Sequence, residues 1–277
     1  LKFWGIFTKN VLVAVNLQFV FTFVLCSISA YVVLRKMNVG YVLSVGGAVL
    51  YAFSPYLYGR HIGHYCLTAC YFIPASVYLC YCSYFDGDFL KFNKGFVCKK
   101  NLLIILMCFC IATNGIGYYP FFTCFYLCIT ALCKIINTRK WKDVIPAIKV
   151  IIIICMGFVL ALLPVAIHKI VSGTESITIR TPADIEIYSL KITQLFVPMY
   201  SHGIAFVQNF INEYNSNMPL VNENMTSYLG IVGCAGFLIS ILFILGIKKG
   251  NSEDEDVLFL SKLNLMAVIF MSIGGFI

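Results

Sequence analysis

The chain has 277 residues, of which 60% are hydrophobic and 12% charged, and its formal net charge is +8. Soluble globular domains carry about 25% charged residues, so this composition argues against a soluble protein. The positive charge is dispersed in short gaps between apolar runs. We therefore expect contact with a lipid bilayer and no nucleic-acid partner.

The Lys and Arg residues are spread unevenly over these gaps. Fourteen of the twenty fall in alternate gaps. These are Arg35, Lys36, Lys91, Lys94, Lys99, Lys100, Lys134, Arg139, Lys140, Lys142, Lys149, Lys248, Lys249 and Lys262. Because cytoplasmic loops collect Lys and Arg, we predict that these gaps face the cytoplasm and that the other gaps face outward.

Three apolar runs open the chain. A spanning helix needs roughly 20 apolar residues. We predict a first span at 10–34, running from outside to inside, and a second at 39–58 that returns outward. A third span is predicted at 65–85, with a kink at Pro74, which lies near its middle.

The next apolar region is interrupted. The run 101–113 is apolar but covers only about two-thirds of a span. The segment 114–117 then breaks it, and a full-length apolar run follows at 118–136. Since both flanks of the region are basic, the chain must go out and come back, which puts the break on the outer side.

The last third of the chain contains one long gap. A span at 150–168 leads outward, and 169–226 is predicted to be an outer loop with interfacial helices. The run 228–247 returns inward, 248–262 is predicted to be a charged inner loop, and 263–277 starts one more helix. The prediction is an all-α polytopic transmembrane bundle of about eight helices with one long extracytoplasmic loop.

The ends of the chain suggest how it is organised. It begins at Leu1 without Met and stops at Ile277 inside an apolar run. We therefore expect a single transmembrane domain, 1–277, that is a piece of a longer multi-pass membrane protein, with 169–226 as its loop subdomain.

A first polar cluster lies between residues 54 and 64, where Ser54 and Pro55 favour the start of a short helix. If that helix continues, Arg60 and His64 share one face, with His61 beside them. Arg recognises phosphate with two parallel hydrogen bonds, and a nearby His adds a donor. The alternative is an Arg that reaches lipid headgroups from an interfacial aromatic belt.

A second cluster follows the break. Gly115 and Gly117 allow backbone N–H groups to approach a ligand, and Asn114, Tyr118 and Tyr119 surround them. These residues are candidates for substrate binding. A tight turn between two helices is the competing interpretation.

A third cluster lies in the long outer loop. Arg180, Asp184, Glu186 and Glu223 combine charge with nearby amides and aromatic rings, as carbohydrate-binding surfaces do. We expect part of 169–226 to fold back over the first two clusters. Asp184 or Glu186 would then orient an acceptor hydroxyl, and Arg180 would help to hold phosphate. The alternative is an ordinary folded extramembrane segment.

Three short motifs carry a resemblance to a known family. They are Phe53-Ser54-Pro55-Tyr56 with Arg60 and Gly63-His64, then Asn114-Gly115-x-Gly117-Tyr118-Tyr119, and then Arg180-x-Pro182 with Glu186-x-Tyr188. In this order they resemble the large bacterial polytopic glycosyltransferases of GT-C type, including the YfhO-like group. The similarity spans most of the chain.

The resemblance implies an active site on the outer side of the cell membrane. There the enzyme would transfer a sugar from a polyprenyl-phosphate donor to a cell-envelope glycan acceptor. In that family the catalytic carboxylate usually follows the first transmembrane helix, and residues 1–9 contain no Asp or Glu. That acid is therefore expected upstream of this chain. No cofactor is expected, and the sequence leaves dependence on a divalent metal open.

Two other classes of function stay open. A transporter or lipid flippase would show ionisable residues at mid-membrane and repeated halves, and neither is evident here. A non-catalytic envelope assembly factor would use the outer loop only for protein contacts.

Overall fold

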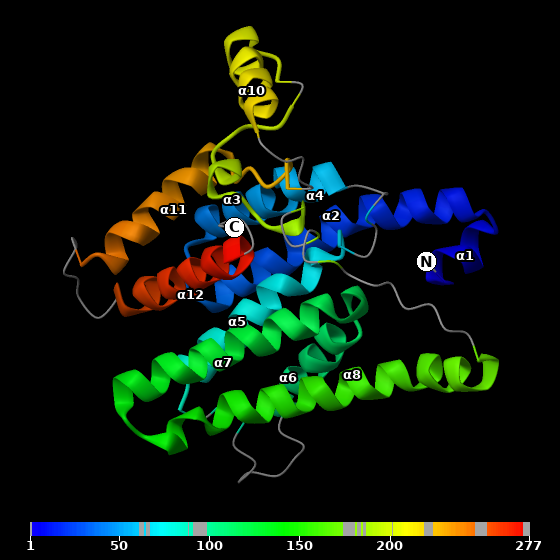
Figure 1. Cartoon of the computed structure of the whole chain (residues 1–277). Helices are drawn as coiled ribbons and strands as arrows, with labels where there is room; N and C mark the ends of the chain where they lie inside the picture. The colour runs from blue at the N-terminus through cyan, green and yellow to red at the C-terminus, as the bar shows by residue number, and fades with distance from the viewer. Residues whose placement is uncertain are drawn as a thin grey trace. The chain divides into compact units, whose positions relative to one another are not determined.

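A computed structural model describes residues 2–60, 64, 67–87, 89–90, 99–173, 181, 184, 187–200, 202–218, 224–246 and 254–273. Within these ranges every regular element is helical, which confirms the all-α prediction (Figure 1). The chain divides into two compact units. Unit 1 comprises Leu1–Phe53 and His61–Ser176, and unit 2 comprises Ser54–Arg60 and Ile177–Ile277. The predicted loop subdomain 169–226 thus falls mostly within unit 2.

Four helical segments are long and apolar enough to cross a membrane, and they suggest a membrane protein. They are Val11–Lys36, Tyr41–Arg60, Tyr118–Thr138 and Trp141–Ser172. Each overlaps a span predicted from the sequence. Only 17–33% of the residues in these apolar stretches are buried, so most of their side chains are at least partly exposed. Exposure of this kind is unfavourable in water and is expected in lipid.

Three of the other predicted spans correspond to shorter helices. The last one, at 263–277, overlaps the helix Asp254–Ser272, which is less apolar. Helices α5 (Ile73–Phe85), α6 (Lys99–Ala112) and α11 (Gly230–Ile244) have 13, 14 and 15 residues. A helix that crosses a bilayer upright needs roughly 20. Of the eight or so spans predicted, four are therefore supported by helix length and composition.

Unit 1 is a bundle of helices with small side chains at its contacts. Helix α1 (Lys2–Thr8) precedes α2 (Val11–Lys36), which packs beside α3 (Tyr41–Ala52). The buried residues of α2 and α3 are mainly small, so the two backbones approach closely. They are Ala14, Thr22, Cys26, Ala30 and Val33 in α2, and Ser44, Ala48 and Ala52 in α3.

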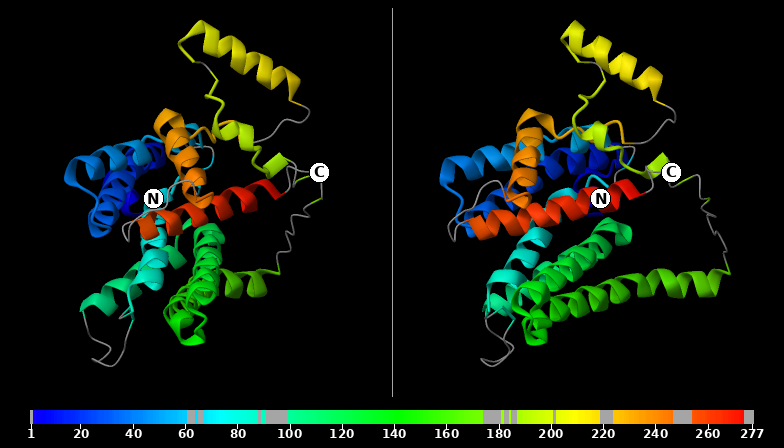
Figure 2. Two further views of the ribbon diagram at one scale, coloured as in Figure 1. Left: turned by 90° about the vertical axis from the view of Figure 1, so that its left-hand side faces the viewer. Right: turned by 60° about the vertical axis from the view of Figure 1, so that its left-hand side comes forward.

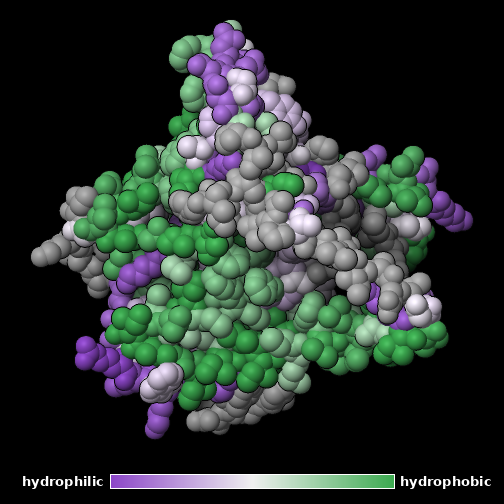
Figure 3. Space-filling view, viewed as in Figure 1, coloured by the Kyte–Doolittle hydropathy of each residue, from purple (hydrophilic) through white to green (hydrophobic). Residues whose placement is uncertain are grey.

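The second half of unit 1 contains the longest helix. Helix α7 (Tyr118–Thr138) is joined by η5 (Trp141–Val144) to α8 (Ile145–Ser172), and α8 packs along α6 and α7. Figure 3 shows mainly hydrophobic residues on the visible side of α7 and α8. Side chains near the end of α8, such as Ile170 and Val171, are exposed.

The structure corrects the predicted role of Pro74. It lies in the first turn of α5, directly after η2 (Cys70–Phe72), and not in the middle of a helix. Proline is favoured there because the first N–H groups of a helix have no partner inside the helix. Pro74 therefore starts the helix instead of kinking it.

A second correction concerns the predicted inner loop 248–262. Helix α12 (Asp254–Ser272) begins inside that range, so residues 254–262 are helical. Glu255 and Asp256 fall in its first turn, where the helix dipole stabilises negative charge. Charged residues are common in loops, but these acids lie at the N-terminal end of a helix, which favours negative charge.

Unit 2 is built around residues of the predicted outer loop. It contains α4 (Pro55–Arg60), η6 (Ile192–Leu195), α10 (Ala205–Asn217), α11 and α12. Leu190 and Leu195 pack with Val268 of α12 and Phe237 of α11. The backbone N–H of Leu190 also donates to the carbonyl of Met271 at 2.9 Å. Helices α11 and α12 lie side by side (Figure 2).

Candidate functional site

The first predicted cluster forms a short helix, as its sequence indicated. Helix α4 begins at Pro55 and ends at Arg60. Arg60 is only 9% exposed, although Arg is among the residues least often buried unless it is paired. A buried guanidinium needs neighbours that accept its hydrogen bonds or compensate its positive charge.

Tyr56 and Asn224 contact the Arg60 guanidinium. It lies 5.5 Å from the centre of the Tyr56 ring, one helical turn earlier, in a cation–π contact. Its Nη2 donates a hydrogen bond of 3.4 Å to Oδ1 of Asn224. The Nδ2 of Asn224 in turn donates to the carbonyl oxygen of Tyr188 at 2.8 Å. We call Arg60, Tyr56, Asn224 and Tyr188 the Arg60 cluster.

Gly59 lets the two chain segments of this cluster approach each other. A Cβ atom at position 59 would overlap the side chain of Thr226 and would also crowd Met199. Thr226 is itself buried. Residues of the segment 169–226 therefore pack directly on α4, whereas its fold over residues 114–119 stays a prediction.

Of the two histidines in the first cluster, the structure describes His64. Helix α4 ends before His64, which is exposed and belongs to unit 1. The shared helical face predicted for Arg60 and His64 stays a prediction, because the segment between them is not among the described residues. His61 lies outside them.

The second cluster has a definite local structure in unit 1. Gly115 and Gly117 have φ angles of +66° and +97°, which only glycine adopts readily. They form η4 (Gly115–Gly117), after which α7 begins at Tyr118. A Cβ at Gly115 would collide with the ring of Tyr119, so glycine is needed at that position for two independent reasons.

Two predicted binding residues of this cluster donate hydrogen bonds to backbone carbonyls. Asn114 is 7% exposed, and its Nδ2 donates to the carbonyl of Ala69 at 2.7 Å. The hydroxyl of Tyr119 donates to the carbonyl of Leu67 at 2.5 Å and lies 3.3 Å from Sγ of Cys70. Both side chains thus fasten the break to the segment before α5. Their contact with substrate stays a prediction, and Tyr118 is half exposed.

The third cluster is described only at Asp184. Its Oδ2 accepts a hydrogen bond of 2.7 Å from the backbone N–H of Thr181, which closes a local turn. Arg180, Glu186 and Glu223 lie outside the described residues. The roles predicted for these four residues in catalysis and phosphate binding stay predictions.

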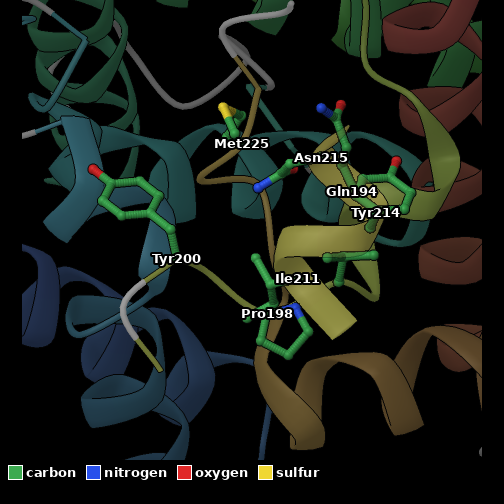
Figure 4. Close-up of a pocket in the computed structure, with 8 residues that line it drawn as sticks. Gln194, Pro198, Tyr200, Ile211, Tyr214, Asn215 and Met225 are labelled. Carbon is green, nitrogen blue, oxygen red and sulfur yellow. The ribbon is translucent and has the colours of Figure 1, made fainter. Parts of the chain in front are cut away.

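Unit 2 also contains a shallow hollow of about 280 Å³, a volume that includes open solvent. It lies between η6, the following residues and α10 (Figure 4). Its lining combines two tyrosines and two amides with apolar side chains. The residues are Gln194, Val197, Pro198, Tyr200, Ile211, Tyr214, Asn215 and Met225.

The sequence interpretation missed several of the residues that define these sites. The sequence predicts none of Asn224, Tyr56 and Tyr188 as a binding residue, although Tyr56 and Tyr188 belong to the three motifs. Contacts between residues so far apart in the chain leave no local pattern. The positions of Ile211, Tyr214 and Asn215 could have been found from their helical spacing.

Within the described residues there is no group of three or more His, Cys, Asp or Glu side chains that could hold a metal ion. The family described as "Domain of unknown function (DUF6311)" matches residues 6–274. No curated protein and no solved structure matches the chain.

Proposed function

We propose that the chain, which belongs to the DUF6311 family, is a membrane glycosyltransferase of GT-C type. It transfers a sugar from a polyprenyl-phosphate donor to a cell-envelope acceptor on the outer face. The bilayer supplies the donor, whose isoprenoid tail lies among the lipids and whose phosphate lies at their surface.

The observation that carries the proposal is the Arg60 cluster. Arg60 is buried, and its guanidinium contacts the Tyr56 ring and the side-chain amide of Asn224. These contacts fix the orientation of the guanidinium before a ligand arrives. A fixed, planar guanidinium is well suited to a phosphate, which accepts two of its N–H groups at once.

The chemistry of sugar transfer needs a cation at the phosphate. When the glycosidic bond to phosphate breaks, negative charge develops on the leaving phosphate oxygen. A pre-oriented guanidinium stabilises that charge in the transition state. A carboxylate must also accept the proton of the attacking hydroxyl. Asp184 and Glu186 are the candidates for this role within the chain.

The orientation of the site follows from the distribution of charge in the sequence. The basic gaps would face the cytoplasm, which puts Arg60 and the 169–226 segment on the outer side. Lipid-linked donors and envelope acceptors meet on that side.

Binding of polyprenyl phosphate to the full chain in nanodiscs tests the proposal. We expect saturable binding that weakens about 10- to 100-fold in Arg60→Ala, since a hydrogen bond to a charged group contributes about 1.5–3 kcal/mol. The affinity of Arg60→Lys should lie between those of the wild type and Arg60→Ala. Lysine keeps the positive charge but lacks the planar pair of N–H donors of the guanidinium. Lys169→Gln removes an exposed cation of unit 1 and serves as the matched control.

Equal affinity in wild type and Arg60→Ala, with both proteins folded, would contradict the role of Arg60. Strong Arg60-dependent binding without sugar transfer from any lipid-linked donor would instead favour a lipid transporter or flippase.

A further inference from the structure

Helix α10 (Ala205–Asn217) carries exposed aromatic side chains on one side. Phe206 and Phe210 are one turn apart, so they lie on the same side of the helix. They are 82% and 50% exposed, whereas Ile211 on the adjacent side is 1% exposed and lines the hollow. Asn212, turned away from the two phenylalanines, is also exposed. Figure 3 shows hydrophobic and hydrophilic residues on different sides of this helix.

The charge of α10 limits what its exposed side can bind. The helix contains no Lys or Arg, and its one charged residue, Glu213, is exposed one turn after Phe210 and close to the same side. It therefore has no electrostatic attraction for anionic lipids or nucleic acid. Any affinity of this side must come from the removal of Phe206 and Phe210 from water.

Hydrogen bonds fasten α10 to the start of an apolar helix. The hydroxyls of Tyr214 in α10 and Thr193 in η6 lie 2.6 Å apart. The carbonyl of Leu195, also in η6, accepts from the backbone N–H of Leu229 at 3.1 Å, directly before α11. Ile231 in the first turn of α11 is 82% exposed. Helix α10 is thus linked through η6 to the start of α11, an apolar helix.

From this arrangement we propose that α10 lies in the interface of the membrane that holds the chain, with Phe206 and Phe210 inserted among phospholipids. Short helices with aromatic residues on one side and polar residues on the other bind at this depth. Aromatic side chains are enriched where helices leave the bilayer. A tethered helix needs little affinity of its own, because the rest of the chain keeps it close to the lipid. This inference is independent of sugar transfer.

Site-specific photocrosslinking of the full chain in nanodiscs tests the proposal. Benzoylphenylalanine is introduced at position 206, 210 or 212, and lipid and protein adducts are measured by mass spectrometry. We expect lipid adducts at 206 and 210 to exceed those at 212 by about tenfold, as expected for residues on opposite sides of an interfacial helix. Because α10 has no basic residue, the yields should be the same in phosphatidylcholine with and without phosphatidylglycerol.

Three results would overturn the proposal. Lipid adducts that are equally rare at all three positions would mean that this side faces water. Adducts to a second copy of the chain at 206 or 210 would identify a protein interface. A yield that rises strongly with phosphatidylglycerol would require a cationic surface that α10 does not have.

A second measurement uses the double variant Phe206→Ser with Phe210→Ser. Amide hydrogen exchange in α10 should increase, because the helix loses its attachment to lipid, while exchange in α11 stays unchanged. Unchanged exchange in both helices would contradict the proposal, since the two side chains would then contribute no attachment.

Discussion

Gly59 shows how one residue determines whether two distant segments can meet. A Cβ atom at this position would overlap Thr226, which lies far along the chain in the predicted outer loop. Gly59 was not singled out in the sequence, because its importance depends on a neighbour that only the fold supplies. It permits the close contact that also brings Asn224 to Arg60.

We expect Gly59→Ala to destabilise unit 2 by about 1–3 kcal/mol, the usual cost of inserting a methyl group into a packed contact. Thr226→Gly removes the atoms that the new Cβ would meet, so the double variant should recover part of the loss. Thermal unfolding of the four proteins in nanodiscs measures this coupling. Strictly additive effects would show that positions 59 and 226 do not touch.

Asn114 was predicted from the sequence as a substrate-binding residue, and its observed contact is structural. Its amide donates to the carbonyl of Ala69, and a buried carbonyl without a donor is costly. The sequence predicted a break at 114–117 with Asn114 beside it, but not the backbone carbonyl to which Asn114 donates.

Asn114→Asp should therefore reduce the stability of unit 1 by about 1–3 kcal/mol, because an ionised carboxylate cannot donate to the Ala69 carbonyl. Asn212→Asp in exposed α10 is the matched control and should change little. Chemical denaturation in detergent micelles gives both values. A stable Asn114→Asp variant that no longer binds polyprenyl phosphate would instead assign Asn114 to the substrate.

At the scale of elements, hydrophobic runs located the helices better than they located the helix ends. The runs at 10–34, 118–136 and 150–168 correspond to α2, α7 and α8, because an uninterrupted apolar run leaves few alternatives. The ends at Pro74 and Asp254 were misjudged. Proline and acids were interpreted as a kink and a loop, although both are also favoured in a first turn.

The two kinds of proline in unit 1 should respond differently to substitution. Pro74 lies in the first turn of α5, so Pro74→Ala should change stability by less than about 1 kcal/mol. Pro164 lies inside α8, so Pro164→Ala restores a backbone hydrogen bond and should raise stability by up to about 3 kcal/mol. Thermal unfolding compares the two variants. A large loss in Pro74→Ala would mean that Pro74 shapes more than the start of a helix.

At the scale of the whole molecule, the composition predicted a membrane protein. The structure limits the number of membrane spans that are supported by helix length and hydropathy. Four helical segments meet the length and hydropathy of a span. Segments such as α6 and α11 are apolar but short. The sequence could not distinguish them, because a run of apolar residues does not reveal where a helix stops. The contact of Arg60 with Asn224, across 164 positions, was equally inaccessible.

The predicted orientation has a direct test in single-cysteine variants made in a cysteine-free background. Cysteine at Asn212, which is exposed in α10, should react with an impermeant maleimide in intact cells. Cysteine at Lys140, exposed between α7 and η5, should react only after permeabilisation. The reverse pattern would invert the topology and remove the Arg60 cluster from the outer face.

The central claim is that Arg60 supports sugar transfer from a lipid-linked donor, and the most direct measurement is transfer itself. Right-side-out vesicles that contain the wild-type chain or Arg60→Ala are given a panel of polyprenyl-phosphate sugars with a radiolabelled sugar. We predict labelled envelope glycan in the wild type with at least one donor, and a rate about 10- to 100-fold lower in Arg60→Ala. No transfer from any donor, or equal rates in the two proteins, would contradict the account.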